Sequence, residues 1–158
     1  MDSTTRSEAA RRLLEAYSSR EAIDALTSTY EGMTLEDAYA IQLEQLAAWT
    51  GRGGRTIKGH KVGLTSAAMQ KLLGVSEPDY GHLLDDFFYL EHMPIPADRF
   101  LQPRIEPEVA FVLKKPLAGP GVTVHEAIAA VDFVLPALEL VDSRIKDWKI
   151  GLFDTIAD

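Results

Sequence analysis

The sequence predicts an α+β fold in which helices precede the main strands. Apolar residues recur at helical spacing in the first third of the chain, and the apolar runs at residues 109–113 and 133–142 have the character of strands. The composition, with 46% hydrophobic and 25% charged residues, is that of an ordinary globular protein. A length of 158 residues is enough for one domain with a buried core.

The composition also excludes several classes of protein. The net charge is -8, whereas a protein that binds a nucleic-acid backbone needs a clustered basic surface. No apolar run approaches the ~20 residues of a membrane span, and the polar N-terminus lacks the form of a secretory signal. The absence of cysteine excludes disulfides and thiolate zinc sites. We therefore expect a cytoplasmic protein that binds neither nucleic acid nor membrane.

The N-terminal part is predicted to be helical. Residues 7–17 have the apolar spacing of an amphipathic helix, and a short segment at residues 22–26 follows. A second helix is expected at residues 34–49, because a threonine with an acid three residues later is typical of a helix start. The side chains that it should bury are Leu35, Ala38, Tyr39, Leu43, Leu46 and Ala47. The glycine-rich residues 51–55 lack the spacing of a phosphate-binding loop and are expected to form a plain helix-to-strand connection.

Residues 56–65 are predicted to form a strand with one candidate for chemistry. Lys61 shares a strand face with Gly59 and Gly63, since successive side chains alternate between faces. Glycine lets a ligand approach closely, so this face could hold Lys61 beside an anionic group. The alternative is a surface lysine next to glycines that mark a bulge. Neither alternative is excluded by the spacing.

The following segment contains shorter predicted elements. Ser66 should cap a helix at residues 67–73 that ends at Gly74. Residues 78–81 read as a turn that contains Asp79, and a short strand is expected around residues 87–90. A helix should open at Thr123. The histidines lack metal-ligand spacing, and His60 is singled out only because it adjoins Lys61; the four are His60, His82, His92 and His125.

Three carboxylates lie in the two strands with the most apolar sequences. Glu106 and Glu108 share one strand face, and the apolar run after them is typical of a strand covered on both sides. Glu139 lies among apolar residues of the second strand. A buried carboxylate cluster needs protonation, a basic partner or a metal ion, and Mg²⁺, Mn²⁺ and Ca²⁺ take oxygen ligands. The alternative is a solvent-facing Glu-Pro-Glu on an edge strand, where proline is tolerated.

Several motifs resemble the 2-keto-4-pentenoate hydratases of the fumarylacetoacetate hydrolase superfamily, whose close relatives are the 4-oxalocrotonate decarboxylases. They are Lys-Val-Gly-Leu-Thr at 61–65, Pro-Asp-Tyr-Gly at 78–81, Gln-Pro-Arg-Ile-Glu-Pro-Glu at 102–108, Leu-Pro-Ala-Leu-Glu at 135–139, Ser-Arg-Ile at 143–145 and Asp-Trp at 147–148. The resemblance implies a mixed β-roll or barrel with N-terminal helices, in a homo-oligomer. On this basis we expect a helical segment at 1–55 and the first part of the roll at 56–158, incomplete at its C-terminus.

The resemblance also implies an activity and a site. It implies Glu106, Glu108 and Glu139 as ligands of Mg²⁺ or Mn²⁺, and active-site roles for Lys61 and Asp79. The expected reaction is the addition of water to 2-hydroxypenta-2,4-dienoate, giving 4-hydroxy-2-oxopentanoate in the meta-cleavage catabolism of aromatic compounds. The alternatives are decarboxylation of 4-oxalocrotonate, cleavage of an acylpyruvate C–C bond, and an inactive fragment that acts only as a binding module.

Overall fold

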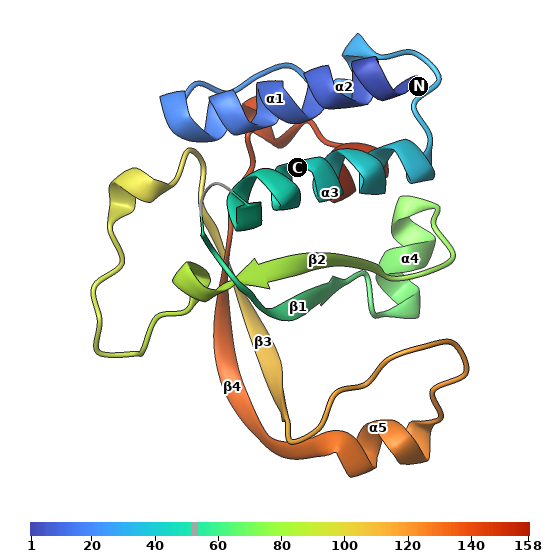
Figure 1. The fold of residues 1–158 in the computed structure, drawn as a ribbon, viewed down its shortest axis with the longest axis vertical. Helices are drawn as coiled ribbons and strands as arrows, with labels where there is room; N and C mark the ends of the chain where they lie inside the picture. Colours follow the sequence, from blue (N-terminus) through green and yellow to red (C-terminus); the bar gives the residue numbers. More distant parts are fainter. Residues whose placement is uncertain (52–53) are drawn as a thin grey trace. The chain divides into compact units, whose positions relative to one another are not determined.

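The computed structural model describes residues 1–51 and 54–158, so part of the glycine-rich connection predicted at residues 51–55 lies outside the described residues (Figure 1). The chain forms two compact units, one made of Met1–Gln102 with Ser143–Asp158 and the other of Pro103–Asp142. Helices and strands are both present, which confirms the α+β class. The predicted division of the chain at residue 55 remains a prediction.

Helices form the core of the first unit. Helix α1 (Ser3–Ser19) packs against α3 (Leu35–Gly51). Helix α6 (Leu152–Ala157) packs against α3 and also contacts the short α2 (Leu26–Thr29). The side chains buried between them include Ala9, Leu13, Leu26, Ile41 and Ile156. The helical spacing of the N-terminal sequence is therefore confirmed, and the apolar C-terminal segment belongs to this core. No helix in the described part of the chain is long and apolar enough to cross a lipid bilayer.

The buried face of α3 differs from the predicted one. Leu43 is 49% exposed and Ala47 is exposed, whereas Asp37 and Gln45 are buried. These polar side chains can occupy the core because the fold gives them partners. Gln45 donates from Nε2 to the Ala157 carbonyl at 2.7 Å, which ties α3 to α6.

Asp37 links the start of α3 to the N-terminus of the chain. Its carboxylate accepts hydrogen bonds from the Met1 ammonium at 3.1 Å, from Arg6 Nε at 2.8 Å and from the Thr34 amide at 2.9 Å. Burial alone would raise the pKa of Asp37, but the hydrogen bonds from Thr34, Met1 and Arg6 outweigh burial and hold this pKa well below its ordinary range. Asp37 is therefore a buried, fully ionised carboxylate.

The strands of the first unit form a two-stranded antiparallel ribbon. Strand β1 (Ile57–Gly63) pairs with β2 (Asp79–Leu84), and α4 (Ala67–Leu73) lies between them in sequence. The predicted caps of α4 are confirmed, since the Ser66 hydroxyl accepts from the Met69 amide at 3.2 Å and Gly74 has a left-handed φ of 68°. The predicted turn at residues 78–81 is wrong, because these residues from Asp79 onward pair with β1.

The short segment expected at residues 22–26 contains a bridge and the start of a helix. Ile23 forms a bridge with Ile145, its amide donates to the Arg144 carbonyl at 2.8 Å, and α2 begins at Leu26. One further prediction in this unit is corrected. The strand expected around residues 87–90 is replaced by a 3-10 turn at Asp85–Phe87 and irregular chain, because the acids at the turn bond Thr56 and Arg99. Other 3-10 turns are Ala97–Arg99 and Lys146–Trp148.

The second unit is a long antiparallel ribbon with one helix. Strand β3 (Arg104–Leu113) pairs with β4 (Val131–Val141), and α5 (Val124–Ala130) leads into β4 after a capping box formed by Thr123 and Glu126 (Figure 1). The described residues contain no closed barrel, since each sheet has two strands.

The expectation that β3 and β4 are covered on both faces is wrong for this chain. Phe111 is 63% exposed and Leu138 is 72% exposed. The reason is that Pro103–Asp142, all of which is described, holds two strands and one short helix. Three such elements are too few to enclose both faces of a ribbon, so its apolar side chains meet water.

Candidate metal centre

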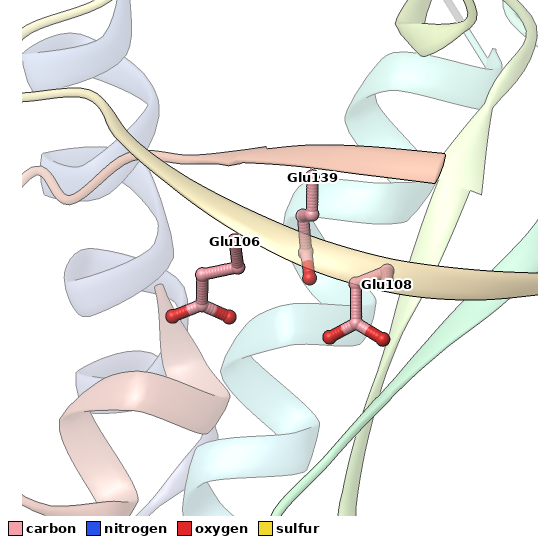
Figure 2. A group of neighbouring side chains, drawn as sticks. All are labelled: Glu106, Glu108 and Glu139. Carbon is pink, nitrogen blue, oxygen red and sulfur yellow. The ribbon is translucent and has the colours of Figure 1, made fainter. Parts of the chain in front are cut away.

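Three carboxylates converge on one face of the ribbon formed by β3 and β4. Glu106 is directly opposite Glu139 in the antiparallel register, and Glu108 is two residues farther along β3. Residues two apart in a strand, and residues directly opposite across a pair, share a face. Figure 2 shows the three side chains extending to the same side, Glu106 and Glu108 from β3 and Glu139 from β4. One oxygen atom from each residue lies within 4.8 Å of the others.

The span of these oxygen atoms suits a hard divalent cation. Ligand oxygens on opposite sides of Mg²⁺ are about 4.2 Å apart and those around Ca²⁺ about 4.6–5.2 Å, twice the metal–oxygen distance. The observed 4.8 Å span therefore needs little side-chain movement to close around either ion. Three carboxylates on one side leave the remaining coordination positions to water or to oxygen atoms of a substrate. The donor set thus fits the predicted metal.

The burial of the three glutamates differs from the prediction. Glu106 and Glu108 are exposed and Glu139 is half-buried, because the ribbon is open on both faces. At ~4 Å in water, two charges interact by only about 1 kcal/mol, so this clustering does not by itself require an ion. The exposed pair agrees with the alternative of a solvent-facing Glu-Pro-Glu. The convergence of Glu139 with that pair is not explained by the alternative.

Lys61 and Asp79 share one face of the other ribbon. Lys61 is opposite Gly81, and Asp79 is opposite Gly63, in the register of β1 and β2. A Cβ atom on Gly81 would lie 3.3 Å from Lys61 Cγ, and one on Gly63 would overlap Oδ1 of Asp79. Each of these glycines therefore leaves the space that a polar side chain of the opposite strand occupies. The only register shift in this ribbon lies between Ile57 and Gly59, so Gly63 does not mark a bulge among the described pairs.

Asp79 has an unsatisfied buried oxygen. The residue is 8% exposed, and Oδ1 makes no hydrogen bond within the described residues. Burial of a polar atom without a partner is unfavourable, and such atoms need an explanation when they occur in a native fold. A bound ligand or water is one such explanation. The geometry therefore keeps Asp79 as a candidate site residue, together with the half-buried Lys61.

Sequence reasoning missed the roles of Gly81 and of the β2 register. Residues 78–81 were predicted as a turn from their composition. Residues 79–84 do not alternate polar with apolar side chains, so local periodicity gives no signal for this strand.

The chain is similar to several hydratases over nearly its whole length. It is 48% identical, over an alignment 163 positions long, to a 2-oxo-hept-4-ene-1,7-dioate hydratase of Escherichia coli, and the alignment covers 99% of this chain and 61% of that protein. It is 47% identical, over an alignment 160 positions long, to a 2-hydroxypent-2,4-dienoate hydratase of Pseudomonas putida, and the alignment covers 100% of this chain and 71% of that protein. The chain thus spans 61% to 71% of the length of these two curated relatives. No protein-family model matches it.

Solved structures share the fold. A 4-oxalocrotonate decarboxylase from Pseudomonas putida G7, complexed with magnesium and adipate, superposes with a TM-score of 0.92 at 33% identity. The match covers 99% of this chain and 59% of that one. The same decarboxylase complexed with calcium and acetate gives a TM-score of 0.90 at 32% identity, with the same shares covered. The fold implied by the sequence motifs is thereby confirmed for the part of it that this chain spans.

Proposed function

Because this chain belongs to the family of 2-keto-4-pentenoate hydratases and related hydratases, we propose that it is the metal-binding part of a hydratase that acts on a 2-hydroxydienoate. The reaction is the addition of water to 2-hydroxypenta-2,4-dienoate, giving 4-hydroxy-2-oxopentanoate. The observation that carries the proposal is the convergence of Glu106, Glu108 and Glu139 within 4.8 Å in a chain with this family membership.

The three glutamates would hold a divalent ion, Mg²⁺ or Mn²⁺. The support is their donor chemistry, together with the magnesium and calcium complexes of the structural neighbour. Such an ion, when bound, supplies Lewis-acid polarisation of an oxygen atom of the substrate. Glu139, which is half-buried, has less freedom to move than the exposed pair and would fix the position of the ion against the ribbon.

Lys61 and Asp79 are proposed to bind the substrate and move its protons. The reaction places one proton on C5 when the dienol becomes a ketone, and another on C3 when hydroxyl adds to C4. A lysine ammonium can hold the substrate carboxylate or donate a proton, and the unpaired Oδ1 of Asp79 can accept one. The glycines opposite them, Gly81 and Gly63, leave open the space that these two side chains occupy.

Decarboxylation of 4-oxalocrotonate is the second candidate function. It is favoured by the TM-score of 0.92 to a 4-oxalocrotonate decarboxylase. The identity to that protein is 33%, against 47% and 48% to the two hydratases, and we therefore prefer hydration. The predicted homo-oligomer and cytoplasmic location remain predictions, as does acylpyruvate hydrolysis.

One assay separates these functions. The chain, with excess Mg²⁺, is given 2-hydroxypenta-2,4-dienoate and 4-oxalocrotonate in parallel, and the dienoate absorbance and CO₂ release are followed. Loss of the dienoate with formation of 4-hydroxy-2-oxopentanoate is the expected result. Release of CO₂ without hydration of the dienoate would assign the second function. No reaction, with Mg²⁺ binding shown separately, would leave the chain as a metal-binding module only.

A further inference from the structure

Two histidines face each other on the side of the first ribbon opposite Lys61. His60 on β1 is directly paired with His82 on β2, so both side chains project from the same face. Their ring centroids are 4.9 Å apart and the rings are tilted by 58°. His60 adjoins Lys61 in a strand, and neighbouring residues point to opposite faces. This histidine pair is therefore separate from the face that carries Lys61 and Asp79.

Gln42 on α3 fixes the protonation of His82. The Gln42 amide nitrogen donates to the Ile156 carbonyl at 2.8 Å and to the Tyr80 carbonyl at 3.3 Å. Because a carbonyl can only accept, the atom of the Gln42 amide that faces these two carbonyls must be Nε2. The amide oxygen, Oε1, then faces His82 Nδ1 at 3.1 Å. Because Oε1 only accepts, Nδ1 of His82 must carry the proton. The other ring nitrogen, Nε2, then presents a lone pair.

The distance between the rings fits a shared metal ion. An imidazole nitrogen binds Zn²⁺ at ~2.0–2.1 Å, so two imidazoles on one ion at a near-tetrahedral angle have centroids about 5 Å apart. The observed separation is 4.9 Å. A histidine ligand whose second nitrogen donates to an acceptor is the common outer-shell arrangement of metal sites, since it orients the ring and fixes the tautomer. Gln42 provides that acceptor for His82.

We propose that His60 and His82 form a binding site for a divalent ion of the borderline class, such as Ni²⁺ or Zn²⁺, with water completing the coordination. Imidazole prefers these ions, whereas carboxylates prefer Mg²⁺, Ca²⁺ and Mn²⁺. The site is accessible, since His60 is exposed and His82 half-buried. Burial, and the nearby His60, lower the pKa of His82.

The test is a calorimetric titration of the untagged protein with Ni²⁺ in the presence of excess Mg²⁺, which occupies oxygen sites and leaves imidazole nitrogens free. One equivalent of Ni²⁺ should bind. His60→Ala and His82→Ala should each weaken binding by roughly tenfold or more, the scale found for loss of even an outer-shell partner. The matched control is His125→Ala, which removes an exposed histidine from α5 and should bind Ni²⁺ like the wild type.

A second measurement needs no variant and so does not depend on folding of the mutants. In NMR spectra of the wild-type histidine side chains, substoichiometric Ni²⁺ should broaden the signals of His60 and His82 before those of His92 and His125. Wild-type affinity in either His60→Ala or His82→Ala would overturn the proposal. Equal broadening of all four histidines, or an equal loss of affinity in His125→Ala, would also overturn it.

Discussion

Gly63 and Asp79 lie opposite each other across β1 and β2, so close that a Cβ atom on Gly63 would overlap the Asp79 carboxylate. The Asp79 carboxylate occupies the space that any side chain larger than hydrogen at position 63 would need. Gly63 therefore determines whether Asp79 keeps its buried position.

Gly63→Ala should destabilise the protein and move Asp79. Overpacking of this kind costs about 1–3 kcal/mol, measured as the change in free energy of unfolding in urea. Gly59→Ala is the matched control, because it lies on the same strand and a Cβ atom there would meet nothing within 4 Å. Equal stability of the two variants would contradict the close approach of Gly63 and Asp79.

Asp37→Asn should destabilise the helical core. The substitution leaves the Met1 ammonium and Arg6 without their buried partner, and loss of one member of a buried ion pair costs roughly 3–5 kcal/mol. The free energy of unfolding in urea measures this loss. Glu36→Gln, a neutralising change at the exposed neighbouring position, should change it by less than about 0.5 kcal/mol. A similar cost in both variants would mean that Asp37 is not the buried anchor.

Asp37 should also make the stability depend on pH. Its pKa in the folded protein is lowered from the ordinary 3.8, so in acid the unfolded chain binds a proton that the folded chain does not. The stabilisation is therefore complete above pH ~5 and is lost as the pH falls through and below 3.8. Urea unfolding at pH 6 and pH 3 should show a larger loss in the wild type than in Asp37→Asn. Parallel losses would show that another group controls acid unfolding.

Mg²⁺ should bind at the three glutamates, with one ion per chain in a calorimetric titration. Glu106→Gln should abolish this binding, because it removes one of the three charged oxygen ligands of the cluster. At ten times its dissociation constant, the ion should stabilise the second unit by about 1.4 kcal/mol. Glu91→Gln, at an exposed acid outside the cluster, is the control. Undiminished Mg²⁺ binding by Glu106→Gln would show that these three glutamates are not the Mg²⁺ site.

If the protein is the proposed hydratase, Lys61→Gln should lower kcat by a factor of roughly 10² or more, the usual contribution of a proton-transfer group. Lys58→Gln, an exposed lysine on the same strand, should retain activity. The rate of dienoate hydration at saturating Mg²⁺ measures both. A lysine that only supports the fold would instead lower the melting temperature and spare kcat in the folded fraction.

The sequence was sufficient for features set by local periodicity. The alternation of strand side chains predicts that Glu106 and Glu108 share a face, and the structure brings Glu139 opposite them. The caps of α4 at Ser66 and Gly74 were equally local and are confirmed.

Features that depend on distant partners were not predictable in this way. The buried face of α3 contains the polar residues Asp37 and Gln45. Asp37 binds the N-terminal ammonium and Gln45 binds the carbonyl of Ala157, and both partners are distant in sequence. The strand at Asp79 was hidden by turn-forming residues, since its pairing with Gly63 outweighs local propensity. The exposure of Phe111 could not follow from apolar runs, because these signal a preference for burial and not the presence of a covering element.

The open ribbon of the second unit has a practical consequence for handling the chain. A two-stranded sheet leaves the outer backbone groups of both strands unpaired, and here apolar side chains such as Val109, Phe111 and Leu138 flank them. Such edges are templates on which identical molecules add strand to strand. Concentrated stocks should therefore form β-rich aggregates that nucleate at residues 109–113. A Val109→Lys gatekeeper should delay that aggregation, as thioflavin fluorescence would record.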